Sequence, residues 1–175
     1  MEQIRGLLQD YIASPGAPPK PAEAVHQDYQ NVAQTAPKDV VAQGIASAFR
    51  SNQTPPFAQM VSSLFDQSGG PQRANLLNQL LGAAGPGLAS DVLSRLGLSD
   101  LAGSLAGSQG NVTPDQASRV PAPAVKEMAS QAESQDPSIV DTLSRFYADH
   151  PEEVKKLGHE ALSIAMSAMG NRSVA

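Results

Sequence analysis

The 175-residue chain has no cysteine and no tryptophan, and only 4% of its residues are aromatic. The lack of cysteine excludes disulfides, thiolate metal sites, iron–sulfur ligation and thiol catalysis, and it fits a reducing compartment, so we expect a cytoplasmic protein. The core must be built from Leu, Val, Ile, Met and Ala. Because each of these side chains buries little area, we expect stability to be spread over many contacts.

Charge is also scarce, since charged residues make up 17% of the chain and the net charge is −5. Proteins that bind nucleic acid usually have a basic surplus or a basic face. Here Lys155 and Lys156 form the one adjacent basic pair, and Glu152 and Glu153 stand beside it. No stretch of 18 apolar residues predicts a membrane span, and the first residues do not resemble a secretory signal. The composition therefore disfavours nucleic-acid and membrane partners.

Apolar residues recur at helical spacing along most of the chain, and no alternating β-branched run suggests a strand. We therefore predict an all-α protein, a bundle of short helices separated by prolines. Thr54, Thr113 and Asp136 each precede a proline and are predicted to cap the helix that follows. The predicted helices cover residues 2–13, 22–36, 114–119, 122–134, 137–148 and 151–169. Three more are predicted in between: one is opened by Pro37 and carries apolar residues from Val41 to Phe49, one follows Thr54 and carries Phe57 to Phe65, and one starts at residues 68–71 and carries Leu76 to Leu81.

Composition divides the chain into four predicted segments. Residues 1–21 are an amphipathic helix with a Pro-rich tether, and residues 22–81 form an N-terminal helical unit. Residues 82–112 are a Gly/Ala/Ser-rich connector with short helices, of which the second is weakened by glycines that each cost about 1 kcal/mol against Ala. Residues 113–175 form a C-terminal helical unit.

The first helix presents the candidate association face of this chain. Five apolar side chains fall on one helical stripe: Ile4, Leu7, Leu8, Tyr11 and Ile12. Residues 14–21, rich in proline, favour an extended spacer of roughly 25 Å. The stripe can dock on its own domain, exchange between protomers or enter a groove of another protein. Membrane-surface binding is disfavoured because the polar face is not rich in Lys.

Three stretches resemble the YidB-like family of uncharacterised bacterial proteins. They are residues 109–116, which read QGNVTPDQ, residues 143–146, which read LSRF, and residues 48–57, which read AFRSNQTPPF. The resemblance implies an all-helical fold with a homeodomain-like C-terminal unit. The family has no established activity, so no functional residue can be transferred from it.

No constellation of residues predicts a catalytic, cofactor or metal site. His26, His150 and His159 are far apart in the sequence and do not form a zinc-binding pair. A nucleophile elbow needs a strand before the serine, and residues 106–110 (AGSQG) lack both the strand and the full motif. Glu152 and Glu153 suit a helix N-terminus, where negative charge is stabilised.

The leading prediction is a non-enzymatic cytoplasmic helical protein, without a cofactor, that self-associates or binds a protein partner. One alternative is a DNA-binding module in which residues 113–148 form a helix-turn-helix-like unit. Its recognition helix would be residues 122–134, where Lys126 and Gln131 stand beside Glu127 and Glu133, or residues 137–148, where Arg145 stands beside Asp141. A second alternative is an enzyme or small-molecule binder with a pocket between two helical lobes. No residue of the sequence selects a substrate for it.

Overall fold

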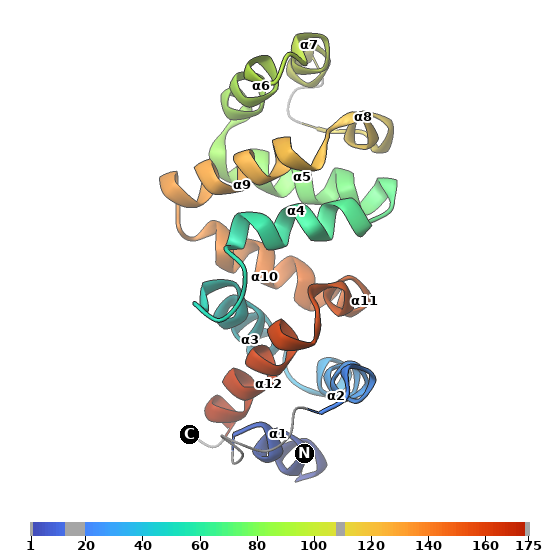
Figure 1. The fold of residues 1–175 in the computed structure, drawn as a ribbon, viewed down its shortest axis with the longest axis vertical. Coiled ribbons are helices and arrows are strands. Elements are labelled where there is room, and N and C mark those ends of the chain that lie inside the picture. Colours follow the sequence, from blue (N-terminus) through green and yellow to red (C-terminus); the bar gives the residue numbers. More distant parts are fainter. Residues whose placement is uncertain (1, 13–19, 108–110, 174–175) are drawn as a thin grey trace. The chain divides into compact units, whose positions relative to one another are not determined.

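The computed structural model describes residues 2–12, 20–107 and 111–173, and it confirms the all-α prediction (Figure 1). No strand occurs in these ranges. The helices of the N-terminal part are α1 (Glu2–Ile12), α2 (Ala22–Thr35), α3 (Lys38–Arg50), α4 (Phe57–Gln67), α5 (Gly70–Ala84) and α6 (Pro86–Arg95). They are followed by α7 (Ser99–Gly107), α8 (Pro114–Arg119), α9 (Ala122–Gln135), α10 (Ile139–Asp149), α11 (Pro151–Val154), the 3-10 helix η1 (Lys155–Leu157) and α12 (His159–Ser173).

Two threonines predicted to cap helices behave differently. Thr113 forms the expected capping box with Gln116, in which each side chain accepts a hydrogen bond from the other residue's backbone N–H. Thr54 instead donates its hydroxyl hydrogen to the carbonyl oxygen of Ala48, at 2.6 Å, and so satisfies the end of α3. The helix after it, α4, begins behind Pro56 without a side-chain cap.

The prediction of one helix over residues 151–169 is wrong. The chain forms α11 and η1, and then turns at Gly158 before α12 begins. Gly158 has φ of +89°, a conformation that side chains with a Cβ rarely adopt. The apolar spacing continues across this turn, so periodicity alone does not reveal it.

The helices form two compact units, and these differ from the predicted segments. Unit 1 comprises residues 1–55 and 144–175, and unit 2 comprises residues 56–143. Residues 113–175 are therefore divided between the two units, and the homeodomain-like unit that the family resemblance implied stays a prediction. The predicted connector lies within unit 2, where α6 and α7 bury Leu88, Val92 and Leu105 among other side chains.

In unit 2, α9 is the central helix and packs against α4, α5 and α6. Its buried side is made of small and flexible residues: Ala124, Val125, Met128, Ala129 and Ala132. The hydroxyl of Ser62 donates to the carbonyl oxygen of Ala122 at 2.9 Å, which ties α4 to the start of α9. The Asn78 side chain bonds the backbone of Val112 and holds the chain entering α8.

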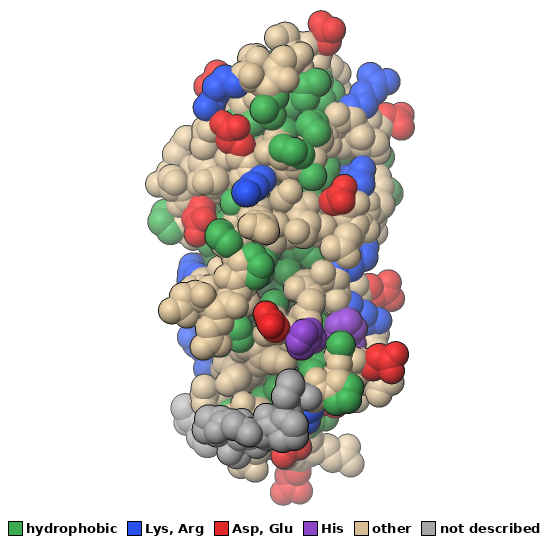
Figure 2. Space-filling view, viewed as in Figure 1, with side chains coloured by type: hydrophobic (Ala, Val, Ile, Leu, Met, Phe, Trp, Pro, Cys, Tyr) green, Lys and Arg blue, Asp and Glu red, His purple; other side chains and the backbone are tan. Residues whose placement is uncertain are grey.

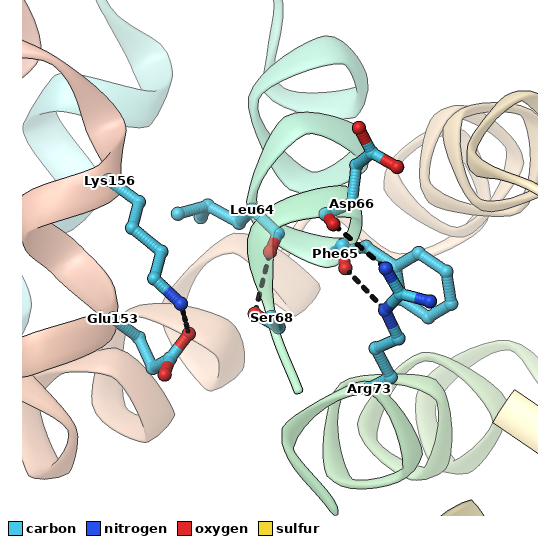
Figure 3. A network of polar contacts seen from close by, with 7 residues as sticks. All are labelled: Leu64, Phe65, Asp66, Ser68, Arg73, Glu153 and Lys156. Atoms are coloured by element: carbon cyan, nitrogen blue, oxygen red, sulfur yellow. Dashed lines mark hydrogen bonds and ion pairs between the residues drawn. The ribbon is translucent and has the colours of Figure 1, made fainter. Parts of the chain in front are cut away.

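Arg73 closes the turn between α4 and α5 (Figure 3). Its guanidinium donates to the carbonyl oxygens of Phe65, at 2.9 Å, and Asp66, at 2.8 Å. These carbonyls lie in the last turn of α4, where intrahelical donors are lacking and a cation is favourable. Figure 3 also shows the ion pair of Glu153 and Lys156, at 3.0 Å, which belongs to unit 1.

In unit 1, α12 is the central helix and contacts α3, α1 and α2. Its buried residues are Ala161, Leu162, Ala165, Met166, Met169 and Gly170. Gly44 of α3 faces it so closely that a Cβ built there would lie 2.6 Å from Met169 Cγ and 2.8 Å from the carbonyl oxygen of Ala165. The two helices can approach this closely only because position 44 carries no side chain.

Substitution of Gly44 tests this close approach. Gly44→Ala should lower the free energy of unfolding by about 1–3 kcal/mol, because the backbone of α12 must move away. Gly82→Ala is the matched control, since a Cβ at Gly82 meets nothing within 4 Å, and it should raise that free energy by about 0.5–1 kcal/mol. Chemical denaturation of both variants measures the difference. Equal effects of the two substitutions would contradict the close crossing of α3 and α12.

Two buried tyrosines of unit 1 respond to alkaline pH. Tyr29 is fully buried and its hydroxyl has no hydrogen-bond partner among the described residues. Burial raises the pKa of Tyr29 above its ordinary value of 10.0. Burial and, to a smaller extent, the charge of Glu153 raise the pKa of Tyr147. The unfolded chain therefore ionises these groups at lower pH than the folded chain does, and folding stability is lost as pH rises above about 10.

Tyr29→Phe should raise the free energy of unfolding by about 1 kcal/mol at neutral pH, because it removes an unpaired buried hydroxyl. It should also reduce the fall of that free energy above pH 10 by up to about 1.4 kcal/mol per pH unit. Urea titrations at neutral and alkaline pH measure both effects. A loss of stability at neutral pH would show that the hydroxyl is well bonded in the folded protein.

Candidate association surface

The predicted association face of α1 lies against its own unit. Of its five side chains, Leu8 is 2% exposed, and Ile4, Leu7, Tyr11 and Ile12 are half-buried. The helix contacts α12 and, to a smaller extent, α2. We call the surface that it covers, on α12 around Gly170 and on α2 around Asp28, the α1 seat. The structure thus shows docking in cis, which was one of the outcomes that the sequence left open.

Gly170 of α12 is the point of closest approach in the α1 seat. A Cβ built on Gly170 would lie 2.6 Å from Ile12 Cδ1 and 3.1 Å from the carbonyl oxygen of Leu8. The backbone of α1 therefore approaches α12 closely where α12 has no side chain. With a side chain at position 170, Ile12 would have to shift and the carbonyl oxygen of Leu8 would have to move by a few tenths of an ångström.

A polar cluster, here called the Asp28 clasp, joins the end of α1 to α2. The Tyr11 hydroxyl donates to Asp28 Oδ2 at 2.8 Å. Lys20 Nζ lies 3.3 Å from the same oxygen, 3.8 Å from Asp10 Oδ2 and 4.4 Å from the centre of the Tyr11 ring. Partial burial, followed by the hydrogen bond to Asp28 and the charges of Asp28 and Asp10, raises the pKa of Tyr11. The phenol therefore stays a donor over the whole neutral range.

Apolar burial contributes more than the clasp to the docking of α1. Full burial of one Leu side chain is worth about 1.5–3 kcal/mol. An exposed ion pair is worth roughly 0–1 kcal/mol, and the Lys20 and Asp10 side chains are 36% and 69% exposed. In addition, α1 has 11 residues, and helices shorter than about 12–15 residues are marginal in water without a packing partner. The helical state of α1 thus depends on an apolar seat.

Two of the remaining candidate residues make contacts within unit 1. The Nδ1 atom of His150 lies 2.8 Å from the carbonyl oxygen of Phe146, and Glu153 pairs with Lys156. Within the described part of the chain, no group of three or more His, Cys, Asp or Glu side chains can hold a metal ion. Residues 108–110 of the serine-containing segment, residue 13 of the predicted first helix and residues 14–19 of the predicted tether lie outside the described residues.

One of the two helices offered for DNA recognition, residues 122–134, keeps its Lys126 side chain exposed in this fold. It corresponds to α9, which is packed among α4, α5 and α6. Unit 2 carries four Lys or Arg residues and eight Asp or Glu residues, so it has an acidic balance. On the face drawn in Figure 2, Lys and Arg side chains are scattered singly among Asp and Glu. Attraction to phosphate would be weak.

None of the described helices is both long and apolar enough to cross a membrane. A scan of protein-family models and searches of curated proteins and of solved structures found no match to this chain. The relation to the YidB-like family therefore stays a prediction, and the α1 seat must be interpreted from its own geometry.

Substitution of Gly170 tests the seat. Gly170→Ala should favour the undocked state of α1 by about 1–3 kcal/mol, because the new methyl group overlaps Ile12 Cδ1. Ile12→Val removes that atom, so the double variant should recover part of the loss, which is the sign of direct contact; the contacts with Ile12 Cγ1 at 3.0 Å and the Leu8 carbonyl oxygen at 3.1 Å remain. Hydrogen exchange of the α1 amides measures the docking. Gly6→Ala is the control, since a Cβ at Gly6 meets nothing within 4 Å, and it should leave exchange unchanged or slower.

Proposed function

We propose that this chain is a non-enzymatic protein that associates with other chains by docking an amphipathic helix in the α1 seat. The observation that carries the proposal is the crossing of α1 and α12 at Gly170, with Leu8 fully buried beside it. Helix-in-groove recognition uses apolar anchors at i, i+3 and i+4. Leu8, Tyr11 and Ile12 have this spacing. The helix α1 therefore occupies the seat, within its own chain, in the way that we propose for a partner helix.

The weak attachment of α1 supports exchange of this helix. Only one of its side chains is fully buried, and its polar contacts with α2 involve partly exposed groups. Elements with few buried apolar contacts open at a small fraction of the global unfolding free energy. An α1 that opens in this way exposes an apolar stripe and, at the same time, the seat on α12. Both surfaces then need a partner.

The proposed partner class is a short amphipathic helix in the same compartment, which we propose to be the cytoplasm. A helix that fits must place small or flexible side chains over Gly170 and an anchor equivalent to Leu8. It gains from a hydrogen-bond donor opposite Asp28, because the Tyr11 hydroxyl fills that position in cis. We also propose that the protein has no enzymatic activity.

Exchange of α1 can be measured on the whole chain after a single cut. A protease site is placed within residues 14–19, the chain is cleaved, and a fluorescent peptide of residues 1–13 is added. We expect the peptide to replace the cleaved α1 with saturable binding, read by fluorescence anisotropy. Leu8→Asp in the peptide should weaken binding at least tenfold, or about 1.4 kcal/mol. Gln3→Ala, on the exposed face, should not.

Two results would defeat the proposal. One is a cleaved chain that retains its circular dichroism but exchanges no peptide. The other is a scrambled peptide of the same composition that binds as well as the natural one, because binding would then not depend on the order of the apolar anchors.

A further inference from the structure

The apolar anchors of α1 fix where the helix docks, but they do not distinguish α1 from other amphipathic helices. Within this same chain, Leu143, Phe146 and Tyr147 of α10 have the same i, i+3 and i+4 spacing. Apolar contacts discriminate weakly between similar side chains, whereas a site built to bond a hydroxyl rejects a ligand that lacks one. Selection of one helix by the seat therefore needs a polar group that contacts the docked helix.

The Asp28 clasp contacts both ends of one side chain of α1. The Tyr11 hydroxyl donates to Asp28 Oδ2 at 2.8 Å, and Lys20 Nζ lies 4.4 Å from the centre of the same ring. A carboxylate at this position accepts a donor, and an ammonium group is attracted to the face of an aromatic ring. Phenylalanine offers the ring without the donor, and serine offers a donor on a short side chain without a ring. A phenol satisfies both groups of the clasp.

Asp28 lies on a helix that is anchored in the core of unit 1. Val25 and Tyr29, which flank it on α2, and Val32, one turn further along, are all buried. The Asp28 side chain is 20% exposed, and its Oδ2 also accepts a hydrogen bond from Lys20 Nζ at 3.3 Å. A carboxylate that is held by a packed helix and by a second donor is preorganised to discriminate between incoming groups.

We infer that Asp28, assisted by Lys20, is the specificity-determining residue of the α1 seat and selects a helix with a tyrosine three residues after its buried leucine. This inference rests on the proposed function, since it states what a partner helix must carry. A phenylalanine in place of Tyr11 leaves the Asp28 carboxylate without its hydroxyl donor. A glutamate there brings a second carboxylate against Asp28, which repels it.

Peptides test the inference on an unaltered seat. The whole chain, cleaved within residues 14–19, is titrated with fluorescent peptides of residues 1–13, and binding is read by anisotropy. Tyr11→Phe in the peptide should weaken binding by about tenfold, because a hydrogen bond to a charged acceptor is lost. Tyr11→Glu should weaken it by about a hundredfold, because like charges meet.

The chain itself supplies a matched competitor for this titration. A peptide of residues 136–148 aligns Leu143 with Leu8 and Phe146 with Tyr11, so it repeats the apolar spacing without the hydroxyl. It also places Arg145 where α1 has Asp10. It should bind about tenfold more weakly than the natural peptide or worse, because it lacks the donor for Asp28.

Substitution at Asp28 separates recognition from a merely structural role. With Asp28→Asn in the seat, the preference for tyrosine over phenylalanine should fall to about threefold or less, because a neutral acceptor bonds the hydroxyl more weakly. The Tyr11→Glu peptide should bind more tightly than it does to the unaltered seat. Structural damage alone would weaken all peptides together and leave the ratios of their affinities unchanged.

Two further seat variants complete the comparison. Glu23→Gln is the control, since Glu23 is exposed on the same helix and its substitution changes the net charge by the same amount as Asp28→Asn. It should leave every ratio unchanged. Lys20→Met should weaken the tyrosine and phenylalanine peptides alike, by about two- to fivefold, because Lys20 lies over the ring that both peptides carry.

The inference is overturned if the unaltered seat binds the Tyr11→Phe peptide as tightly as the natural one, or if a folded Asp28→Asn chain keeps the full preference for tyrosine. The proposed function stands in both cases, because the natural peptide still binds. Where circular dichroism shows that Asp28→Asn has lost its helices, the peptides on the unaltered seat decide alone. A cleaved chain that binds no peptide defeats the proposed function, and this inference with it.

Discussion

The close approach of α12 to its neighbours is the constraint on which unit 1 depends. A chain with few aromatic residues cannot fill wide gaps between helices, so the helices themselves must come together. Gly44 and Gly170 permit this at two crossings, one with α3 and one with α1. Met166 and Met169, both fully buried, suit the irregular space that remains because their side chains are unbranched and flexible.

The two crossings of α12 differ in how many buried residues accompany them. The crossing with α3 is accompanied by seven buried residues on α3, including Val41, Ile45 and Phe49, so that contact belongs to the permanent core. The crossing with α1 is accompanied by one buried residue, Leu8. A helix that has one fully buried side chain, and is too short to persist alone, is suited to exchange. The proposed association follows from this difference in burial.

The candidate face of α1 was predictable from the sequence, whereas its partner surface was not. The spacing of Leu8, Tyr11 and Ile12 identifies a stripe that must be covered. Gly170, Asp28 and Lys20, which complete the seat, lie on other segments and carry no local pattern that links them to α1.

The sequence by itself determined where helices form and where most of them end, because apolar spacing, prolines and capping side chains act within a few residues of one another. The capping box of Thr113 and Gln116 is an example. The turn at Gly158, by contrast, was not predicted from such local signals. Only the tertiary structure decided that residues 144–175 join the N-terminal helices and that α1 rests on α12. These two arrangements depend on shape complementarity between segments that are distant in the chain, and no local sequence pattern reveals it.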